Sequence, residues 1–366
     1  MRRTKRCGSH RRMLVPVVVL GLVSLGIVSL QLFEREVTKP LTLHVKPAHR
    51  QLVHKHVHSV LQQKCRPGNA RRSLLERLPA SGHVTQPFLG NNALLPDDLF
   101  HFPPPFGFRG LRDKLEEVLP LLPASEASQQ KDGPEACRRC VVMGNGGILR
   151  DLQLGQLIDR FDTIIRLNSG PLGEFCGDVG NRTSIRMSYP EGTPCQWQDP
   201  DPQALFVAVV YKAVDLSWLS AMINKHAVSL WDWLFFWKKV PDRIPLEPQR
   251  FRLLNLQVIR ETAMGLLQYP PPRLPAWGWD QNVPTLGMSA LTLASLLCDE
   301  VSLAGFSYNL TQQGTPLHYY DRLPMAAMLQ QEMHNVERER ELLRELVKRG
   351  AISDLTGGLH CSFCRG

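Results

Sequence analysis

The feature that most constrains the fold is an alternation of short apolar runs and helical segments, which begins at Cys140. Residues 140–143 and 163–167 have the length and apolar content of buried strands, and residues 148–161 between them carry apolar side chains at helical spacing. This order predicts parallel strands joined by a right-handed crossover. Further strands are expected at 205–210 and 301–305, and further helices at 111–122, 288–297 and 335–349. The fold class is therefore α/β, with a mostly parallel, twisted sheet flanked by helices.

Ligands of such sheets bind beyond the carboxyl ends of the strands. This rule places the segment Gly144-Asn145-Gly146-Gly147 and also Asn168 at the binding edge. Glycines between a strand and a helix let a phosphate approach the backbone, although a tight structural turn has the same pattern. Leu149 stands where a dinucleotide fingerprint needs a third glycine, which disfavours NAD and leaves a nucleotide or nucleotide sugar.

Nine cysteines and two sequons suit an oxidising compartment. Cys140 and Cys298 both precede strands, at the edge opposite the expected site, so we hypothesise that they form a disulfide. Two Cys-x-x-Cys pairs, at 137/140 and 361/364, are weak candidates for zinc or redox chemistry, and the pairing of Cys176, Cys195, Cys361 and Cys364 stays open. The sequons predict N-glycosylation at Asn181 and Asn309.

Residues 14–33 form an uncharged apolar run that is just long enough to span a bilayer. Basic residues precede the run and two glutamates follow it, so the positive-inside rule places the N-terminus in the cytosol and the rest in the lumen. A cleaved signal peptide is the alternative. We expect a cytoplasmic tail at 1–13, a transmembrane signal-anchor helix at 14–33, a luminal stem at 34–60 and a catalytic domain at 61–366.

The net charge of +9 is poor evidence for nucleic-acid binding, because six basic residues lie within the first twelve positions. We therefore expect no nucleic-acid partner. A second apolar stretch, residues 230–240, is rich in tryptophan and phenylalanine but too short and too interrupted by charge to span a membrane. It is either ordinary core or a surface that faces an apolar acceptor or a membrane.

Metal and acid-base candidates are few. The Asp-x-Asp motif Asp199-Pro200-Asp201 follows no apolar strand, so we interpret it as a turn and expect no metal and no cofactor. His318 and His334 each lie near carboxylates, and either could act as a base near neutral pH. Since Glu339 lies about 500° around a helix from His334, these two side chains would not share a face. His334 is expected to precede or begin the last helix and to point into a cleft.

Four segments, in the same order, resemble the motifs of the animal sialyltransferase family. The large motif resembles residues 140–189, with Arg166-Leu167-Asn168-Ser169 among its residues, and the small motif resembles residues 283–306. The third motif resembles His318-Tyr319-Tyr320-Asp321, and the very small motif resembles residues 334–339. The resemblance covers residues 61–366.

The resemblance implies a type II Golgi membrane enzyme that uses CMP-sialic acid without a metal, on a variant of the Rossmann-like GT-A fold. His334 would be the general base of an inverting displacement, and His318 would stabilise the departing phosphate. CMP-sialic acid would be bound by a set of five residues, namely Asn145, Asn168, Thr285, Gly287 and Tyr320. The family disulfide matches Cys140 with Cys298, and a second bridge would join Cys65 to Cys137.

The acceptor implied by the resemblance is a terminal galactose, sialylated at its 3-hydroxyl. Within the family, residues 137–140, 206–209, 234–238 and 282–285 are most similar to members that act on the glycolipid lactosylceramide. A galactose on a glycoprotein is the alternative acceptor. A luminal sugar-binding protein without catalysis is the alternative in another functional class.

Overall fold

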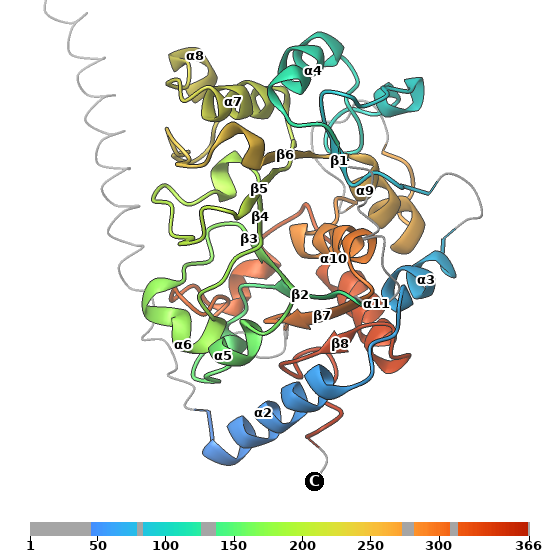
Figure 1. Ribbon diagram of the computed structural model, residues 1–366, viewed down its shortest axis with the longest axis vertical. Coiled ribbons are helices and arrows are strands. Elements are labelled where there is room, and N and C mark those ends of the chain that lie inside the picture. Colours follow the sequence, from blue (N-terminus) through green and yellow to red (C-terminus); the bar gives the residue numbers. More distant parts are fainter. Residues whose placement is uncertain (1–44, 79–82, 126–136, 273–281, 308–313, 365–366) are drawn as a thin grey trace, which may run out of the picture. The chain divides into compact units, whose positions relative to one another are not determined.

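The computed structural model describes residues 45–78, 83–125, 137–272, 282–307 and 314–364. In this part of the chain, one sheet contains eight strands in the order β1-β6-β5-β4-β3-β2-β7-β8 (Figure 1). All neighbouring strands are parallel except β1, which runs antiparallel to β6. The strands are β1 (Phe88–Leu89), β2 (Arg139–Met143), β3 (Thr163–Leu167), β4 (Ile185–Ser188), β5 (Leu205–Ala208), β6 (Phe251–Leu254), β7 (Glu300–Ala304) and β8 (Ser353–Asp354). The expected mostly parallel α/β sheet is confirmed.

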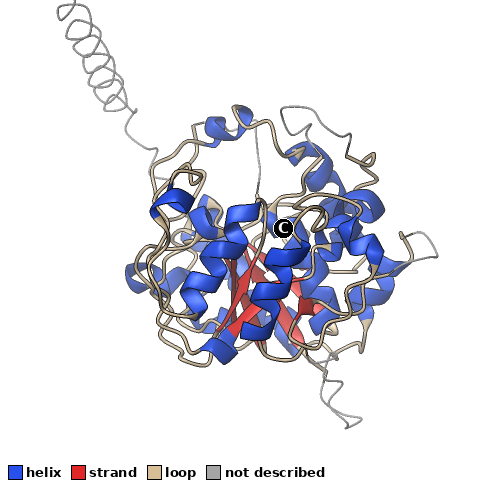
Figure 2. Ribbon diagram, turned by 90° about the horizontal axis from the view of Figure 1, so that it is seen from above, coloured by secondary structure: helices blue, strands red, loops and turns tan. Residues whose placement is uncertain are grey.

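Helices cover both faces of this sheet (Figure 2). They are α2 (Pro47–Gln62), α3 (Asn69–Leu75), α4 (Arg112–Val118), α5 (Gly155–Ile158), α6 (Cys176–Val179), α7 (Ala213–Ile223), α8 (Leu230–Trp233), α9 (Gln257–Arg260), α10 (Leu286–Leu297) and α11 (Val336–Lys348). The expected helices at 111–122, 288–297 and 335–349 correspond to α4 with a following 3-10 turn, α10 and α11.

The central strands are apolar on both faces because each face packs against helices. Val142 of β2 belongs to the same hydrophobic cluster as the buried side of α10, whereas Val141 belongs to a second cluster with α2 and α5. Side chains alternate across a strand, so a strand between two helical layers needs apolar residues at every position. This is why the run at 140–143 is continuous instead of alternating.

The folded part begins before the position expected from the sequence. We placed a polar stem at 34–60, but α2 covers Pro47–Gln62 and buries Val53, Val57 and Val60. These valines belong to the hydrophobic cluster that also contains residues of α5, so α2 packs on the domain. The three valines form one stripe of a helix whose other positions are mostly histidine, lysine and other polar residues. Those residues lower the overall apolar content and hide the periodicity.

The prediction of a helix at 148–161 is wrong. The segment forms a 3-10 turn over Gly147–Leu149, then a loop, and then only the single turn of α5. Asp151 and Gln153 have φ of 61° and 54°, in the left-handed region, and their amides donate to the Asp178 carboxylate at 2.9 and 2.7 Å. Asp178 therefore satisfies backbone donors that a helix would have bonded internally. The apolar residues of the segment are still buried, but from a loop.

The structure contains the expected Cys140–Cys298 disulfide and also the Cys65–Cys137 bridge. Because Cys137 and Cys140 are bonded to other partners, the zinc and redox interpretations of that Cys-x-x-Cys pair are wrong. Cys361 and Cys364 form a third disulfide with each other, and Cys176 and Cys195 are free and exposed. The apolar run at 14–33 lies outside the described residues. Within the described part of the chain, every helix is too short or too polar to cross a bilayer.

Candidate active site

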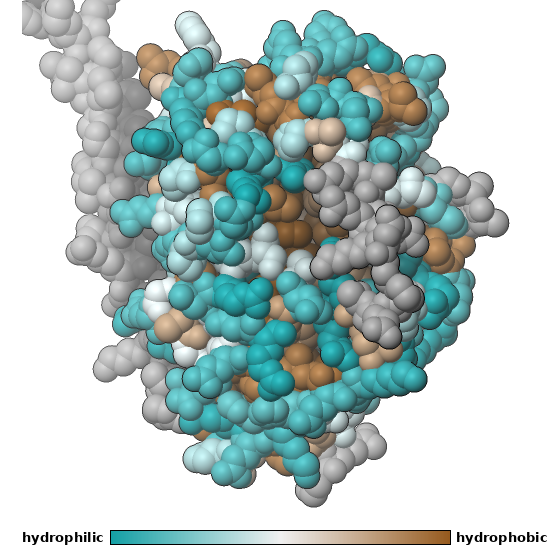
Figure 3. Space-filling view, viewed as in Figure 1, coloured by the Kyte–Doolittle hydropathy of each residue, from teal (hydrophilic) through white to brown (hydrophobic). Residues whose placement is uncertain are grey.

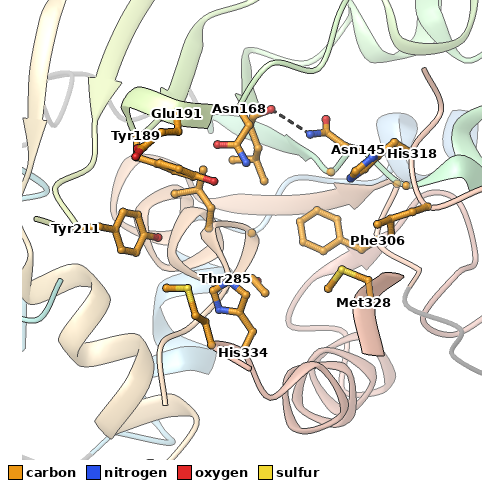
Figure 4. Close-up of a pocket in the computed structure, with 18 of the residues that line it drawn as sticks. Asn145, Asn168, Tyr189, Glu191, Tyr211, Thr285, Phe306, His318, Met328 and His334 are labelled. Carbon is orange, nitrogen blue, oxygen red and sulfur yellow. Dashed lines mark hydrogen bonds between the residues drawn. The ribbon is translucent and has the colours of Figure 1, made fainter. Parts of the chain in front are cut away.

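A cavity of about 520 Å³ lies at the carboxyl edge of the sheet (Figure 4). Loops that follow β2, β3, β4, β5 and β7 line the cavity, and the segment around His318 pairs with the loop after β2. The start of α10 and the segment around His334 complete the lining. This volume is within the range of small-molecule sites. The position agrees with the edge expected from the sequence, and the Cys140–Cys298 bridge lies at the opposite ends of the strands.

The glycines after β2 serve close chain packing. A Cβ on Gly144 or Gly146 would come within 2.6 or 2.5 Å of the Gly305 carbonyl oxygen, and one on Gly147 within 2.4 Å of the Pro316 oxygen. The segment therefore packs backbone against backbone between the ends of β7 and the loop before His318. It opens a 3-10 turn and no helix, so the phosphate site at a helix N-terminus that the pattern suggested is absent from this segment.

Asn145 and Asn168 both line the cavity, from the ends of adjacent strands β2 and β3. Asn145 Nδ2 donates to the Leu167 carbonyl at 3.3 Å, the contact that is dashed in Figure 4. Asn168 has φ of 52°, and its Oδ1 accepts from the Ser188 hydroxyl at 3.3 Å. Both amide side chains are thus held by protein contacts while each keeps hydrogen-bonding capacity for a ligand.

A buried ion pair holds the backbone carbonyl of Asn168 in place. Arg186 Nη2 lies 2.7 Å from Asp199 Oδ1, and Arg186 Nη1 donates to the Asn168 carbonyl at 2.6 Å. Both side chains of the pair are almost fully buried. Asp199 also accepts from the Thr183 hydroxyl at 2.6 Å, so the first residue of the Asp-x-Asp motif is a structural anion. In the described residues, no cluster of three or more His, Cys, Asp or Glu side chains could hold a metal ion.

His318 lines the cavity next to Asn145 (Figure 4), and the Tyr319 amide donates to the Asn145 carbonyl at 3.0 Å. Its Nδ1 lies 2.7 Å from Asp321 Oδ2, and its ring stacks on Tyr320, with centroids 5.1 Å apart and planes 2° from parallel. Tyr320 is not among the cavity-lining residues, and burial raises the pKa of its hydroxyl to about 12. Tyr320 thus packs against His318, and its contact with the donor stays a prediction.

His334 lines the cavity from the segment just before α11, as the sequence indicated. Its Nδ1 lies 2.7 Å from the Val283 carbonyl oxygen, an acceptor, so Nδ1 carries the proton and Nε2 has the free lone pair. The Gln331 amide fixes the backbone, accepting from His334 N and donating to His334 O at 2.8 Å each. Burial lowers the pKa of His334, which favours the neutral ring.

Thr285 caps α10 and is itself held by Glu339. The Thr285 amide and hydroxyl donate to the two Glu339 carboxylate oxygens at 2.6 and 2.7 Å, and the hydroxyl accepts from Met288 N at 3.3 Å. Burial raises the pKa of Glu339 to about 7. The Thr285 proton is therefore used internally, and the first amides of α10 are the groups left for a ligand. Gly287 lines the cavity, and a Cβ at this position would come within 2.8 Å of Phe306 Cε1.

The sequence analysis missed one polar wall of the cavity, which consists of Tyr189, Glu191, Tyr211 and Lys212. The two tyrosine rings pack edge to face with centroids 5.3 Å apart. Lys212 Nζ contacts Glu191 Oε1 and lies 3.6 Å from Asp215 Oδ1, while burial raises the pKa of Asp215 to about 6. Tyr211 and Lys212 follow the expected strand at 205–210, so the rule that selected Asn168 would also have selected them.

Of the two sequons, only Asn181 can be described. It is exposed, whereas Thr183 of the same sequon is buried and bonded to Asp199. Asn309 lies outside the described residues.

Comparison with known proteins decides the class of this site. Residues 88–351 match glycosyltransferase family 29 (sialyltransferase). The chain belongs to this family. It is therefore a sialyltransferase, an enzyme, and the alternative of a sugar-binding protein without catalysis is set aside.

Relatives resemble this chain over nearly its whole length. The lactosylceramide alpha-2,3-sialyltransferase of Rattus norvegicus is 43% identical over 347 residues, covering 94% of this chain and 89% of the relative. Its Homo sapiens counterpart is 44% identical over 348 residues, covering 95% and 83%. A CMP-N-acetylneuraminate-beta-1,4-galactoside alpha-2,3-sialyltransferase of Mus musculus is 38% identical over 296 residues, covering 81% and 78%.

A solved structure confirms the fold of this family 29 member. The crystal structure of a mammalian sialyltransferase in complex with Gal-beta-1-3GalNAc-ortho-nitrophenol has a TM-score of 0.60 and 23% sequence identity, covering 80% of this chain and 98% of that chain. At this identity the likeness concerns the fold alone.

Proposed function

We propose that this sialyltransferase transfers sialic acid from CMP-sialic acid to the 3-hydroxyl of a terminal galactose, and that its acceptor is lactosylceramide. The observation that carries the proposal is the identity of 43–44% with lactosylceramide alpha-2,3-sialyltransferases over 94–95% of the chain. The cavity supports the same reading, since two histidines line it together with amide side chains.

His334 is the proposed general base. Its Nδ1 proton is held by the Val283 carbonyl, so Nε2 is the atom that accepts the proton of the galactose 3-hydroxyl. The hydroxyl oxygen then attacks the anomeric carbon of sialic acid, and the bond from that carbon to the phosphate oxygen of CMP breaks. Attack and departure on opposite faces invert the configuration in one step. A positioned base of this kind typically contributes about 10²–10⁴-fold to the rate.

The donor is held, in this proposal, by groups that surround the cavity edge of β2 and β3. Asn145 and Asn168 bind the cytidine monophosphate part, and the first amides of α10, at Leu286 and Gly287, face its charged groups. His318 is held by Asp321 through Nδ1, and its ring lies at the cavity to meet the charge that develops on the departing phosphate. Positive charge at that point stabilises the leaving group without a metal.

A glycoprotein galactose is the second candidate acceptor, since the chain also resembles a relative whose name specifies a beta-1,4-galactoside and no lipid. The chain is also 38% identical to a beta-1,4-galactoside alpha-2,3-sialyltransferase of Mus musculus, although over a smaller share of its length. The choice between acceptors depends on the part of the cavity beyond the galactose.

The proposed location is the Golgi membrane, in type II orientation. The support is the charge asymmetry around the apolar run at 14–33, with basic residues before it and glutamates after it. The disulfides agree with a luminal catalytic domain.

The test is a side-by-side assay of the full-length protein with CMP-sialic acid and two acceptors, lactosylceramide and a desialylated glycoprotein. We expect CMP release and a sialylated glycolipid whose sialic acid is removed by an α2,3-specific sialidase. Preferential sialylation of the glycoprotein would overturn the acceptor assignment. A product resistant to that sialidase would overturn the linkage.

A further inference from the structure

A cluster of apolar side chains projects from the surface next to the cavity. Leu230, Trp231, Leu234, Phe235 and Trp237 are 69–85% exposed, and they make up five of the nine large apolar side chains exposed in the described residues. We call residues 230–237 the aromatic turn. In the space-filling view, brown surface appears at the upper left, where Figure 1 draws α8 (Figure 3). Single exposed apolar residues are ordinary, but a contiguous group marks an interaction site.

The aromatic turn is held firmly against the domain. The Ser229 hydroxyl accepts from Trp231 N at 3.2 Å and caps α8. Phe236 is buried in the main hydrophobic cluster, and Lys212 Nζ lies 4.9 Å from its ring centroid. Trp233 packs against the same cluster. The turn is thus amphipathic, because positions 233 and 236 face inward and positions 230, 231, 234 and 235 face outward.

The aromatic turn is continuous with the cavity. Trp237 is 73% exposed and also lines the cavity, and Lys212, which contacts Phe236, lines the same wall. Whatever covers the outer side of the turn therefore lies beside the cavity. Lys238 and Lys239 follow directly and are exposed, so cationic groups flank the apolar surface.

We propose that the aromatic turn contacts the surface of a lipid bilayer and lets the cavity take its acceptor from that bilayer. Tryptophan, phenylalanine and leucine beside lysine are the side chains that seat a peripheral segment at the headgroup level. The lysines attract the phosphates of lipid headgroups. A lipid surface at this position leaves the sugar of a glycolipid free to extend past Trp237 into the cavity. This inference rests on the proposed glycolipid acceptor.

The first experiment compares two acceptors that share one sugar. The full-length protein is assayed with lactosylceramide in phosphatidylcholine vesicles and with free lactose in solution. A triple variant, Trp231→Ser with Leu234→Ser and Phe235→Ser, removes three of the outer apolar side chains and leaves Leu230 and Trp237 intact. We expect kcat/KM on vesicles to fall about tenfold, roughly the loss of one buried apolar side chain, and kcat/KM on lactose to stay within about twofold. The control Leu94→Ser removes a side chain that is 86% exposed elsewhere, and should change neither.

A second readout does not depend on catalysis. Brominated acyl chains in the vesicles should quench the tryptophan fluorescence of the wild type more than that of the triple variant. Equal losses on both acceptors would overturn the proposal, because the turn would then act by shaping the cavity. Unchanged kinetics with unchanged quenching would also overturn it, as would a wild-type dimer that the variant dissociates. Failure of the wild type to sialylate either acceptor would refute the proposed function, while the quenching comparison would still test the bilayer contact.

Discussion

The Nδ1 atom of His334 lies 2.7 Å from the carbonyl oxygen of Val283, three residues before the start of α10. One hydrogen bond thus sets the tautomer of the ring and ties it to the helix whose first amides line the cavity. The proposed base and one part of the proposed donor site are therefore positioned relative to each other through a backbone oxygen, which a side-chain substitution at Val283 leaves in place.

The pH dependence of the rate follows from the burial of His334. Burial lowers the pKa of the ring below its ordinary value of 6.5, so the neutral form that can accept a proton persists as the pH falls. We expect kcat/KM to stay level from pH 7.5 down to about 6.5 and to drop only at lower pH. The check is a pH–rate profile with saturating donor. An acidic limb centred above the ordinary value would contradict the assignment.

Glu339 couples stability to pH in the opposite direction from most carboxylates. Its pKa is raised to about 7 from 4.5, so the folded protein binds a proton that the unfolded chain releases, and stability is lost as the pH rises between these values. Glu339→Gln removes this dependence. We expect the free energy of unfolding of the wild type to decline relative to the variant by about 3 kcal/mol between pH 4.5 and 7. Parallel curves from denaturant titrations at several pH values would contradict it.

The absence of a side chain at Gly192 leaves room for the Asn168 side chain. A Cβ at Gly192 would come within 2.4 Å of Asn168 Oδ1, so Gly192→Ala displaces the amide that we assign to the donor. We expect KM for CMP-sialic acid to rise about tenfold with a small change in melting temperature. Gly177→Ala is the matched control, since nothing lies within 4 Å of its Cβ position. An unchanged KM in the Gly192 variant would remove Asn168 from the donor site.

Substitutions can decide whether the Asp-x-Asp motif has a structural role or binds a metal ion. Asp199→Asn leaves Arg186 buried without its counter-charge, which typically costs about 3–5 kcal/mol of stability. Asp201→Asn removes a carboxylate that accepts only a local bond from Gln203 N at 2.7 Å, so we expect nearly unchanged stability and turnover. Thermal unfolding and activity separate the two cases. Loss of activity in the folded Asp201 variant would favour a metal site.

The sequence predicted the sheet and its binding edge because the buried strands are continuous apolar runs. Residues 140–143 and 163–167 became β2 and β3, and the loops after them line the cavity. The helix expected at 148–161 failed because Asp178, distant from those amides in the chain, bonds them. No local pattern carries that information.

Other residues were missed for related reasons. β4 contains Arg186, whose charge is neutralised by Asp199, so the strand lacks an apolar signature and the Tyr189 and Glu191 that follow it went unnoticed. Glu339 was considered only for its position relative to His334, and its contact with Thr285, which joins two motifs 54 positions apart, went unnoticed. Only the folded chain brings them together.

The central claim, that His334 is the base of sialyl transfer, is tested most directly by the turnover of His334→Ala. The exposed His226→Ala serves as the control, and melting temperature and binding of CMP confirm that the fold and the donor site are intact. We expect kcat with lactosylceramide to fall about 10²–10⁴-fold in the His334 variant and to stay at the wild-type level in the control. A His334→Ala enzyme that folds, binds CMP and turns over at nearly the wild-type rate would contradict the account.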